Sequence, residues 1–332
     1  MKWSLEEIEL PLKFNWKLSR NETYVKHNFI VRLQVDELTT CGEVAFNTRY
    51  EESKERILRE FDEFSRDFPD DVDSVEDVMK FCSGRDFCKS LRFGVESAFV
   101  HYMALATDRT VPELLGVPFM SSAPTSFSLP ILDISEIEDF IVDHGLKRFD
   151  VLKVKVNKYS ALSTVETVFN AFSGKVRIDG NECWETAQEV LDFIGAISDL
   201  SRIEFLEQPI RSDCHNEAKK LRDLSPVLLM ADESLTSQDV TEYYAERFHA
   251  VNVKLMKAGS YMKAVLQLRQ ARELGLKTMV GCMIETSLGI SSALNISYGT
   301  DFLDLDGCLL LKEDPFKLIL EENGKLFRSD LH

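Results

Sequence analysis

The sequence predicts an α/β protein in which a TIM-like barrel of parallel strands follows a smaller α+β unit. Three observations indicate this fold. Between residues 150 and 306, short apolar runs of strand type end repeatedly in charged residues, and amphipathic helical segments lie between these runs. The first 120 residues instead show the rhythm of antiparallel strands. Because an unpaired buried charge is costly, the charged strand ends predict one active site at the C-terminal mouth of the barrel.

The α+β unit is expected to span residues 1–120. Residues 7–14, 27–35 and 42–46 read as strands of an antiparallel meander, and residues 50–68 carry apolar side chains at helical spacing. We assign this unit no chemistry from its own residues.

The barrel is expected to span residues 121–307, with strand and helix alternating eight times. Apolar stripes at helical spacing, which we interpret as core packing, run through residues 134–145, 162–172, 190–197 and 260–274. Gly145 suits the C-terminal cap of the first of these helices. The last segment, residues 308–332, is longer than the barrel needs and is predicted to return to the N-terminal unit.

Composition and charge favour a small-molecule enzyme. The formal net charge of −17 disfavours nucleic acid and anionic membrane surfaces as partners. Seven cysteines without CxxC spacing argue for a reduced compartment and against a disulfide framework or a zinc site. No signal peptide and no span of bilayer length is evident, so we expect a cytoplasmic protein without a membrane partner. A homo-oligomer is compatible with the sequence, which does not determine the oligomeric state.

Two lysines stand on one strand of the predicted barrel. Lys153 and Lys155 are two residues apart and therefore face the same side, which in a barrel is the interior. Two inward ammonium groups repel each other, and either a nearby anion or a lowered pKa relieves this repulsion. A lysine with a lowered pKa can serve as a base near neutral pH.

Three carboxylates end three successive strands. Asp179, Glu207 and Asp232 are predicted to converge at the mouth, where three like charges cannot all ionise cheaply. A hard divalent cation resolves this conflict, and oxygen-only ligation with room for substrate is typical of Mg²⁺. The sequence therefore predicts a magnesium site.

A third lysine follows on the next strand. Lys254 is predicted to lie across the barrel from Lys155, with the metal between them. This arrangement suits removal of a proton α to a carboxylate from one face and its return to the other. Mg²⁺ and Lys153 would stabilise the enediolate-like transition state while Lys155 and Lys254 exchange the proton.

These motifs together resemble a known family. They are KVK at 153–155, DGN at 179–181, EQP at 207–209, DES at 232–234 and NVKLMKAG at 252–259. The set resembles the muconate-lactonizing subgroup of the enolase superfamily, which implies a (β/α)7β barrel with an N-terminal capping domain. GCMIE at 281–285 lacks a histidine, which disfavours the subgroup that uses a histidine base.

Within this subgroup the late DLDG motif resembles the dipeptide epimerases of the L-Ala-D/L-Glu type. The resemblance implies that Asp304 and Asp306 bind the α-ammonium group of a dipeptide, and two carboxylates on one face of a strand suit that role. It also places Ser128 and Cys282 at substrate-contacting positions. Asp304 and Asp306 can alternatively form only a turn, and Cys282 only a buried apolar contact.

Substrate specificity stays open. In the family a loop that corresponds to residues 18–28 covers the site, and its arginine aligns with Asn21 here, one residue from Arg20. Arg20 or Lys26 can take the place of this arginine if the loop register shifts. Otherwise a dipeptide with a hydrophobic or cationic second residue is favoured as substrate.

Other interpretations of the same residues remain. Lys257 is interpreted as structural, and Asn181 and Glu233 as groups that orient their neighbours. An o-succinylbenzoate synthase, a cycloisomerase or an N-acylamino acid racemase would use the same lysines and metal. A non-catalytic barrel that only binds ligands is the alternative from another class.

Overall fold

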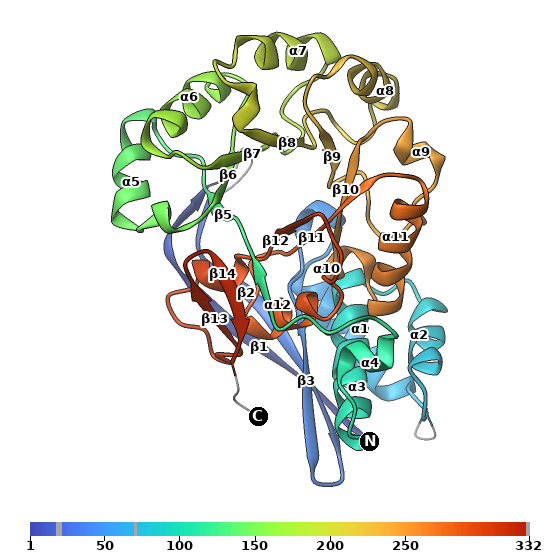
Figure 1. Ribbon diagram of the computed structural model, residues 1–332. Coiled ribbons are helices and arrows are strands. Elements are labelled where there is room, and N and C mark those ends of the chain that lie inside the picture. The colour runs from blue at the N-terminus through green and yellow to red at the C-terminus, as the bar shows by residue number, and fades with distance from the viewer. Residues whose placement is uncertain (18–21, 70–71, 330–332) are drawn as a thin grey trace.

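The structure is a computed structural model that describes residues 1–17, 22–69 and 72–329. Its N-terminal part is an antiparallel sheet with helices on one side (Figure 1). The sheet has the order β1 (Lys2–Lys17), β2 (Glu22–Val35) and β3 (Leu38–Val44). After it come η1 (Thr48–Tyr50), α1 (Lys54–Asp67), α2 (Val75–Ser83), α3 (Lys89–Ala106) and α4 (Val111–Leu115). The predicted meander is present, and the helix expected from residue 50 begins at Lys54, after a side-chain cap from Ser53.

Helix α3 lies very close to strand β3, and two glycines make this approach feasible. A Cβ atom on Gly42 would lie 2.0 Å from the carbonyl oxygen of Gly94, and one on Gly94 would lie 2.4 Å from Val44. The aromatic residues Phe29, Phe64 and Phe99 fill the core between sheet and helices. The N-terminal unit thus has a hydrophobic core of its own.

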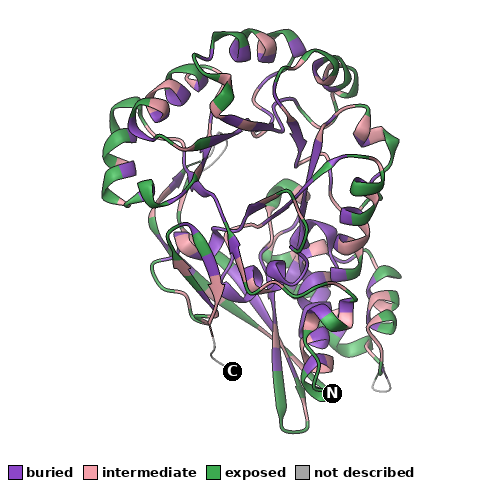
Figure 2. Ribbon diagram, viewed as in Figure 1, coloured by how far each residue is buried: buried purple, intermediate pink, exposed green. Residues whose placement is uncertain are grey.

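The remainder is an eight-stranded parallel sheet curled into a barrel, which confirms the predicted fold class. The strands are β5 (Phe127–Leu129), β6 (Val151–Lys155), β7 (Lys175–Asp179), β8 (Ile203–Glu207), β9 (Leu229–Ala231), β10 (Ala250–Lys254), β11 (Lys277–Gly281) and β12 (Phe302–Asp304). They follow one another in sequence order around the sheet. Helices follow the first seven strands, and a 3₁₀ turn, η5 (Gly307–Leu310), follows the eighth. Buried residues line the strands and the inner faces of the helices (Figure 2).

The helices of the barrel agree with the apolar stripes of the sequence. They are η2 (Ile134–Glu136), α5 (Ile137–Asp143), η3 (Leu146–Arg148), α6 (Ala161–Ala171), α7 (Ala187–Ala196), η4 (Leu200–Arg202), α8 (His215–Leu224), α9 (Glu242–Ala245), α10 (Leu255–Ala258), α11 (Tyr261–Glu273) and α12 (Ser287–Leu294). Gly145 follows α5 with a φ of 59°, the left-handed conformation expected of a helix cap.

The seam of the barrel lies between its first and last strands, and side chains close it. The carboxylate of Asp304 accepts a hydrogen bond from the Ser126 hydroxyl at 2.7 Å. Asp306 accepts one from the Ser128 amide at 2.6 Å. The backbone amide of Leu305 donates to the hydroxyl of Thr125 at 2.9 Å. Three of the predicted substrate-binding residues, Ser128, Asp304 and Asp306, therefore also take part in closing the barrel between its first and last strands.

The C-terminal segment contacts both parts of the molecule. The backbone of Leu311 pairs with Leu12 of β1. The chain then forms β13 (Ile319–Glu322) and β14 (Lys325–Arg328), which add to β4 (Ser122–Pro124) in a separate three-stranded sheet. The boundaries proposed at residues 120 and 307 stay predictions.

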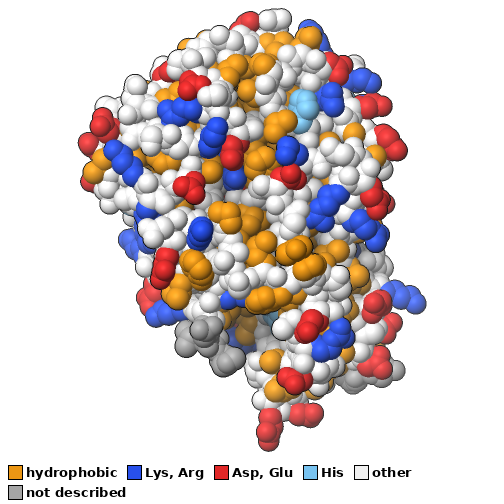
Figure 3. Space-filling model, in the orientation of Figure 1, with side chains coloured by type: hydrophobic (Ala, Val, Ile, Leu, Met, Phe, Trp, Pro, Cys, Tyr) orange, Lys and Arg blue, Asp and Glu red, His pale blue; other side chains and the backbone are white. Residues whose placement is uncertain are grey.

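The surface carries charges of both signs. On the face shown in Figure 3, basic, acidic and hydrophobic side chains are interspersed, and no broad basic patch appears among the side chains drawn there. Among the helices that the structure describes, none combines the length and apolar character needed to cross a bilayer.

Candidate active site

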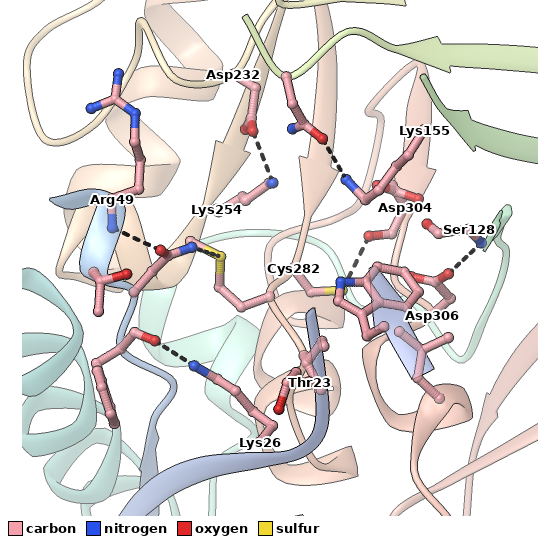
Figure 4. A pocket seen from close by; sticks show the side chains of 18 of the residues that line it. Thr23, Lys26, Arg49, Ser128, Lys155, Asp232, Lys254, Cys282, Asp304 and Asp306 are labelled. Atoms are coloured by element: carbon pink, nitrogen blue, oxygen red, sulfur yellow. Dashed lines mark hydrogen bonds and ion pairs between the residues drawn. The ribbon is translucent and has the colours of Figure 1, made fainter. Parts of the chain in front are cut away.

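A cavity of about 510 Å³ opens at the carboxyl ends of the barrel strands, which we call the mouth. Barrel residues form its floor, and residues of the N-terminal unit form part of its wall, among them Trp16, Lys26 and Tyr50. Figure 4 shows side chains from both parts directed toward this space. Such a cavity, with convergent charged groups at the mouth of a barrel, is where a TIM-like fold places its chemistry.

Lys153 lies on the floor of the mouth with 2% of its surface exposed. Its ammonium group is 2.9 Å from Asp304, 2.8 Å from Glu207 and 3.2 Å from Asp179. Burial alone would lower the pKa of Lys153, but these carboxylates raise it well above its usual value. Repulsion between inward lysines can be relieved by a nearby anion or by a lowered pKa. In the structure, nearby carboxylates relieve it for Lys153. Lys153 is therefore a fixed positive charge rather than a base.

Lys155 and Lys254 face each other across the cavity. Three strands separate β6 from β10 in the sheet order, so the two lysines stand on opposite sides of an eight-stranded barrel. Figure 4 shows them entering from opposite sides with their ammonium groups toward the centre. Lys155 is 2.7 Å from Asp179 and donates to the amide oxygen of Asn181 at 3.2 Å. Lys254 is 3.1 Å from Asp232.

Lys257 also reaches the mouth, which the sequence did not indicate. The chain turns into helix α10 directly after Lys254, and Lys257 on this helix contacts Asp232. Its ammonium group lies 2.7 Å from the carboxylate and 2.6 Å from the backbone oxygen of Asp232. Burial raises the pKa of Asp232, but attraction to Lys254 and Lys257 outweighs it and holds the pKa far below its usual value. Asp232 thus stays ionised between two cations.

The three predicted magnesium ligands are all buried at the ends of adjacent strands. Asp179 is 1%, Glu207 0% and Asp232 4% exposed. As they stand, no three such side chains among the described residues are close enough together to hold one ion. The reason is visible in the ion pairs: Lys153 lies between Asp179 and Glu207, and lysines bind Asp232.

The acids of the barrel nevertheless suit a divalent cation. Among the barrel residues named above, six acids stand against four lysines: Asp179, Glu207, Asp232, Glu233, Asp304 and Asp306 against Lys153, Lys155, Lys254 and Lys257. Lys26 and Arg49 of the N-terminal unit also line the cavity and add positive charge at its wall. Burial raises the pKa of Glu207, and repulsion from Asp179 and Asp232 adds to it. Burial followed by repulsion from Asp232 raises the pKa of Glu233 to about 8. Oxygen donors with excess negative charge fit Mg²⁺.

Asp304 and Asp306 differ in how the chain engages them. Both oxygens of Asp304 have partners, the Ser126 hydroxyl and Lys153. Burial raises the pKa of Asp304, but Lys153 outweighs it and lowers the pKa to about 2. Asp306 instead lies next to Asp304, and burial followed by that repulsion raises its pKa to about 6. Asp306 is the carboxylate of the pair that gains more from an incoming cation.

The other predicted substrate contacts also line the cavity. Ser128 and Cys282 lie on its wall, beside Asp306 and Asp304 (Figure 4). The thiol of Cys282 donates to the backbone oxygen of Asp304 at 3.3 Å, and burial raises its pKa well above the usual value. Arg20 lies outside the described residues. Lys26 lines the cavity and donates to the backbone oxygen of Phe46 at 2.7 Å.

Comparisons with known proteins agree with this fold. A family model described as enolase C-terminal domain-like matches residues 134–306. The L-Ala-D/L-amino acid epimerase of Pedosphaera parvula is 32% identical, over 96% of this chain and 93% of that protein. The dipeptide epimerase of Enterococcus faecalis, solved with Mg and L-Leu-L-Tyr, superposes with a TM-score of 0.88 at 22% identity, covering 99% and 96% of the two chains. That of Methylococcus capsulatus, solved with Mg and L-Arg-D-Lys, gives 0.84 at 22% identity, covering 99% and 98%.

Proposed function

Since the chain belongs to the enolase superfamily, we propose that it is a Mg²⁺-dependent dipeptide epimerase that inverts one α-carbon by two-base proton transfer. Asp179, Glu207 and Asp232 would hold the metal. Lys155 and Lys254 would act as the two bases, and Asp304 and Asp306 would bind the α-ammonium group of the dipeptide. Ser128 and Cys282 would contact the substrate.

The opposed positions of Lys155 and Lys254 carry this proposal. Inversion of a carbon requires that a proton leave one face and that another arrive at the opposite face, so the two bases must stand on either side of the substrate. The two lysines stand on opposite walls of one cavity and point toward its centre (Figure 4). A positioned general acid or base of this kind contributes about 10²- to 10⁴-fold to the rate.

The other charged residues prepare the substrate for proton loss. A proton α to a carboxylate is a very weak acid, so the negative charge of the enediolate needs stabilisation. Lys153 provides a permanent positive charge on the floor of the mouth. Asp179, Glu207 and Asp232 would hold Mg²⁺, which would supply a further positive charge for the substrate carboxylate. Burial lowers the pKa of Lys254, but attraction to Asp232 outweighs it and raises the pKa; neutralising the charge of Asp232 would therefore lower the pKa of Lys254 and increase the fraction of neutral amine that can accept a proton.

The ammonium site distinguishes a dipeptide from the substrates of related reactions. An o-succinylbenzoate synthase and a cycloisomerase act on anions without an ammonium group, and an N-acylamino acid racemase acts on a blocked amine. Asp304 and Asp306 are buried side by side, and their mutual repulsion contributes to the raised pKa of Asp306. A substrate without a positive charge would leave this repulsion uncompensated, so its binding here would be unfavourable. Asp304 and Asp306 therefore support the dipeptide, although both also hold the barrel seam.

Deuterium incorporation tests the proposal. The protein is incubated with Mg²⁺ and a library of L,L-dipeptides in D₂O, and mass spectrometry and chiral chromatography follow the products. We expect a single deuterium at the C-terminal α-carbon, together with the L,D epimer, and neither in the Lys155→Ala/Lys254→Ala double variant. Activity on N-acetylated dipeptides at a rate equal to that on free ones would contradict the ammonium site. Turnover of neither class would contradict the proposed reaction.

A further inference from the structure

The turn after β7 has an unusual backbone conformation. Asn181 and Glu182 have φ angles of 42° and 65°, in the left-handed region that non-glycine residues seldom adopt. Gly180 precedes them, and a Cβ atom there would lie 2.9 Å from the backbone of Pro209. Such a conformation persists only where surrounding contacts hold it, and it is often found where a side chain must be placed exactingly.

This turn places Asn181 against Lys155. The amide oxygen of Asn181 accepts a hydrogen bond from Lys155 at 3.2 Å, and its amide nitrogen donates to Glu233 at 3.2 Å. Its backbone amide donates to Asp179 at 3.1 Å. Asn181 therefore helps Asp179 to fix the direction of Lys155, and the position of Asn181 depends on the turn.

The side chain of Glu182 holds the turn in place. It is only 2% exposed and accepts a hydrogen bond from the Ser212 amide at 2.8 Å. Arg49 binds the same carboxylate in a bidentate manner, at 3.1 Å through Nε and 2.9 Å through Nη2, and also reaches the Ser212 hydroxyl at 3.3 Å. Paired donors of this geometry make the strongest type of ion pair.

Arg49 comes from the N-terminal unit, whereas Glu182 belongs to the barrel. Arg49 lies in η1, where its backbone amide donates to the side chain of Asn47 at 2.9 Å. Asn47 is in turn bound by Glu52, at 3.2 Å from its backbone amide. Arg49 lines the cavity, where Figure 4 shows its side chain directed away from Lys254. Its guanidinium group is bound by Glu182 and Ser212.

We propose that Arg49 is a positioning residue for Lys155: through Glu182 it secures the turn at residues 180–182, and through Asn181 it directs the ammonium group of Lys155. The N-terminal unit then completes one of the two bases. This inference rests on the proposed function, because it gives Lys155 a role in one direction of proton transfer. It predicts an effect of Arg49 that is confined to the face of the substrate served by Lys155.

A second bidentate ion pair provides the matched control. Arg148 binds the two carboxylate oxygens of Glu321 through Nε at 3.2 Å and Nη2 at 2.8 Å, and it joins the barrel to the C-terminal hairpin. The arginines are similarly exposed, at 40% for Arg49 and 36% for Arg148. Arg49 lines the cavity, whereas neither Arg148 nor Glu321 does. Arg148→Met therefore reports what the loss of such an ion pair does to the fold alone.

The experiment compares the two faces of the substrate. Both epimers of a dipeptide that the wild type accepts are incubated in D₂O with each variant. For each starting epimer, we measure separately the deuterated product that keeps its configuration and the deuterated product that is inverted. Lys155→Ala and Lys254→Ala first show which epimer each lysine deprotonates. We expect Arg49→Met to slow proton removal from the epimer that Lys155 deprotonates by roughly tenfold to hundredfold, which is the rate loss caused by a misplaced catalytic group. The rate for the other epimer should change by less than about twofold.

Retention and inversion sharpen this comparison. In Arg49→Met the epimer served by Lys254 should still exchange its proton but invert less often, so its ratio of retention to inversion should rise. Arg49→Lys, which keeps the charge without the bidentate geometry, should restore part of the loss. Arg148→Met should change neither rate. Equal slowing of both epimers, or no slowing of either, in Arg49→Met would overturn the role of Arg49.

A readout without substrate separates this inference from the proposed function. Hydrogen–deuterium exchange of the peptide that contains residues 180–184 should become faster in Arg49→Met and stay unchanged in Arg148→Met, since the amide of Glu182 donates to the Gln208 oxygen at 2.8 Å. If the wild type turns over no dipeptide, the proposed function fails. Unchanged exchange of this peptide in Arg49→Met would refute the securing of the turn, whatever the activity.

Discussion

The two walls of the cavity carry the same chemical group but are built differently. On one wall Lys254 is 9% exposed in its side chain and paired with Asp232, which Lys257 also binds, and all three residues belong to the barrel. On the other wall Lys155 is 11% exposed and pairs with Asp179. Its ammonium group lies 6.0 Å from the ring centre of Trp16, a residue of β1.

If Lys155 and Lys254 are the two bases, the barrel does not support them in the same way. The direct partners of both lysines are barrel residues, but Lys155 is also reached from the N-terminal unit, by Trp16 and, in our proposal, by Arg49 through the turn at residues 180–182. A reaction that needs both faces of one carbon then couples catalysis to the docking of that unit. Perturbations should accordingly divide into those that affect both walls and those that affect one.

Metal removal should have the largest effect, and it should act on both walls. If Asp179, Glu207 and Asp232 hold Mg²⁺, treatment with a chelator should abolish proton exchange from both epimers, because the charge that stabilises the enediolate is common to both directions. Exchange is measured by mass spectrometry before and after dialysis, and added Mg²⁺ should restore it. If proton exchange from one epimer continued after chelation, the two directions of the reaction would not share one metal site.

Removal of either proposed base should affect the two epimers of the substrate differently. In Lys155→Ala or Lys254→Ala, epimerisation should fall by about 10²- to 10⁴-fold, the contribution of a general acid or base. One epimer in each variant should keep its proton, while the other still exchanges by means of the remaining lysine. Chiral analysis with deuterium counting in both starting epimers checks this outcome. Loss of exchange from both epimers in a single variant would mean that the lysines do not act on separate faces.

Lys257 offers a perturbation of the Lys254 wall that mirrors Arg49 on the Lys155 wall. Lys257→Met leaves Lys254 as the single lysine on Asp232, which strengthens that pair and raises the pKa of Lys254 further. We expect proton removal from the Lys254 epimer to slow about tenfold, as for other residues that orient reactive groups. The rate for the Lys155 epimer serves as internal control, and equal slowing of both would assign Lys257 to overall stability.

The residues on the floor and walls of the barrel could be predicted because a parallel barrel directs its strand ends to one place. A charge at the end of each apolar run, at regular spacing, is enough to bring Lys153, Asp179, Glu207 and Asp232 together. The alternation of residues on a strand is likewise enough to turn Lys153 and Lys155 inward.

The supporting contacts could not be predicted, because they depend on where the chain leaves its regular elements. Lys257 reaches Asp232 only because helix α10 begins directly after Lys254, and continuation of the strand would have carried it elsewhere. The pair of Arg49 and Glu182 joins residues that are 133 positions apart, on a 3₁₀ turn and a left-handed turn. The DGN motif shows where the second turn begins, but neither its φ angles nor its partner.

The smallest expected effect is a pH dependence that is the same for both walls. Asp306 must be ionised to bind the substrate ammonium group, and burial followed by Asp304 raises its pKa to about 6. Lys153 opposes this rise, the Ser128 amide donates to Asp306, and the Cys282 thiol beside it stays protonated. Because the ionised fraction falls as the pH drops below the pKa, kcat/KM should fall about tenfold per pH unit below about 6 for both epimers.

Asp306→Asn distinguishes this carboxylate from the bases. The variant should lose the pH dependence near 6, since no proton remains to be bound there, and its KM for both epimers should rise by about tenfold or more, the value of a charge-assisted hydrogen bond. The ratio of the two exchange rates should stay that of the wild type, because the ammonium group is the same in both epimers. A pH profile that bends at different values for the two epimers would instead place the titration on the lysine walls and leave Asp306 with its role in the barrel seam.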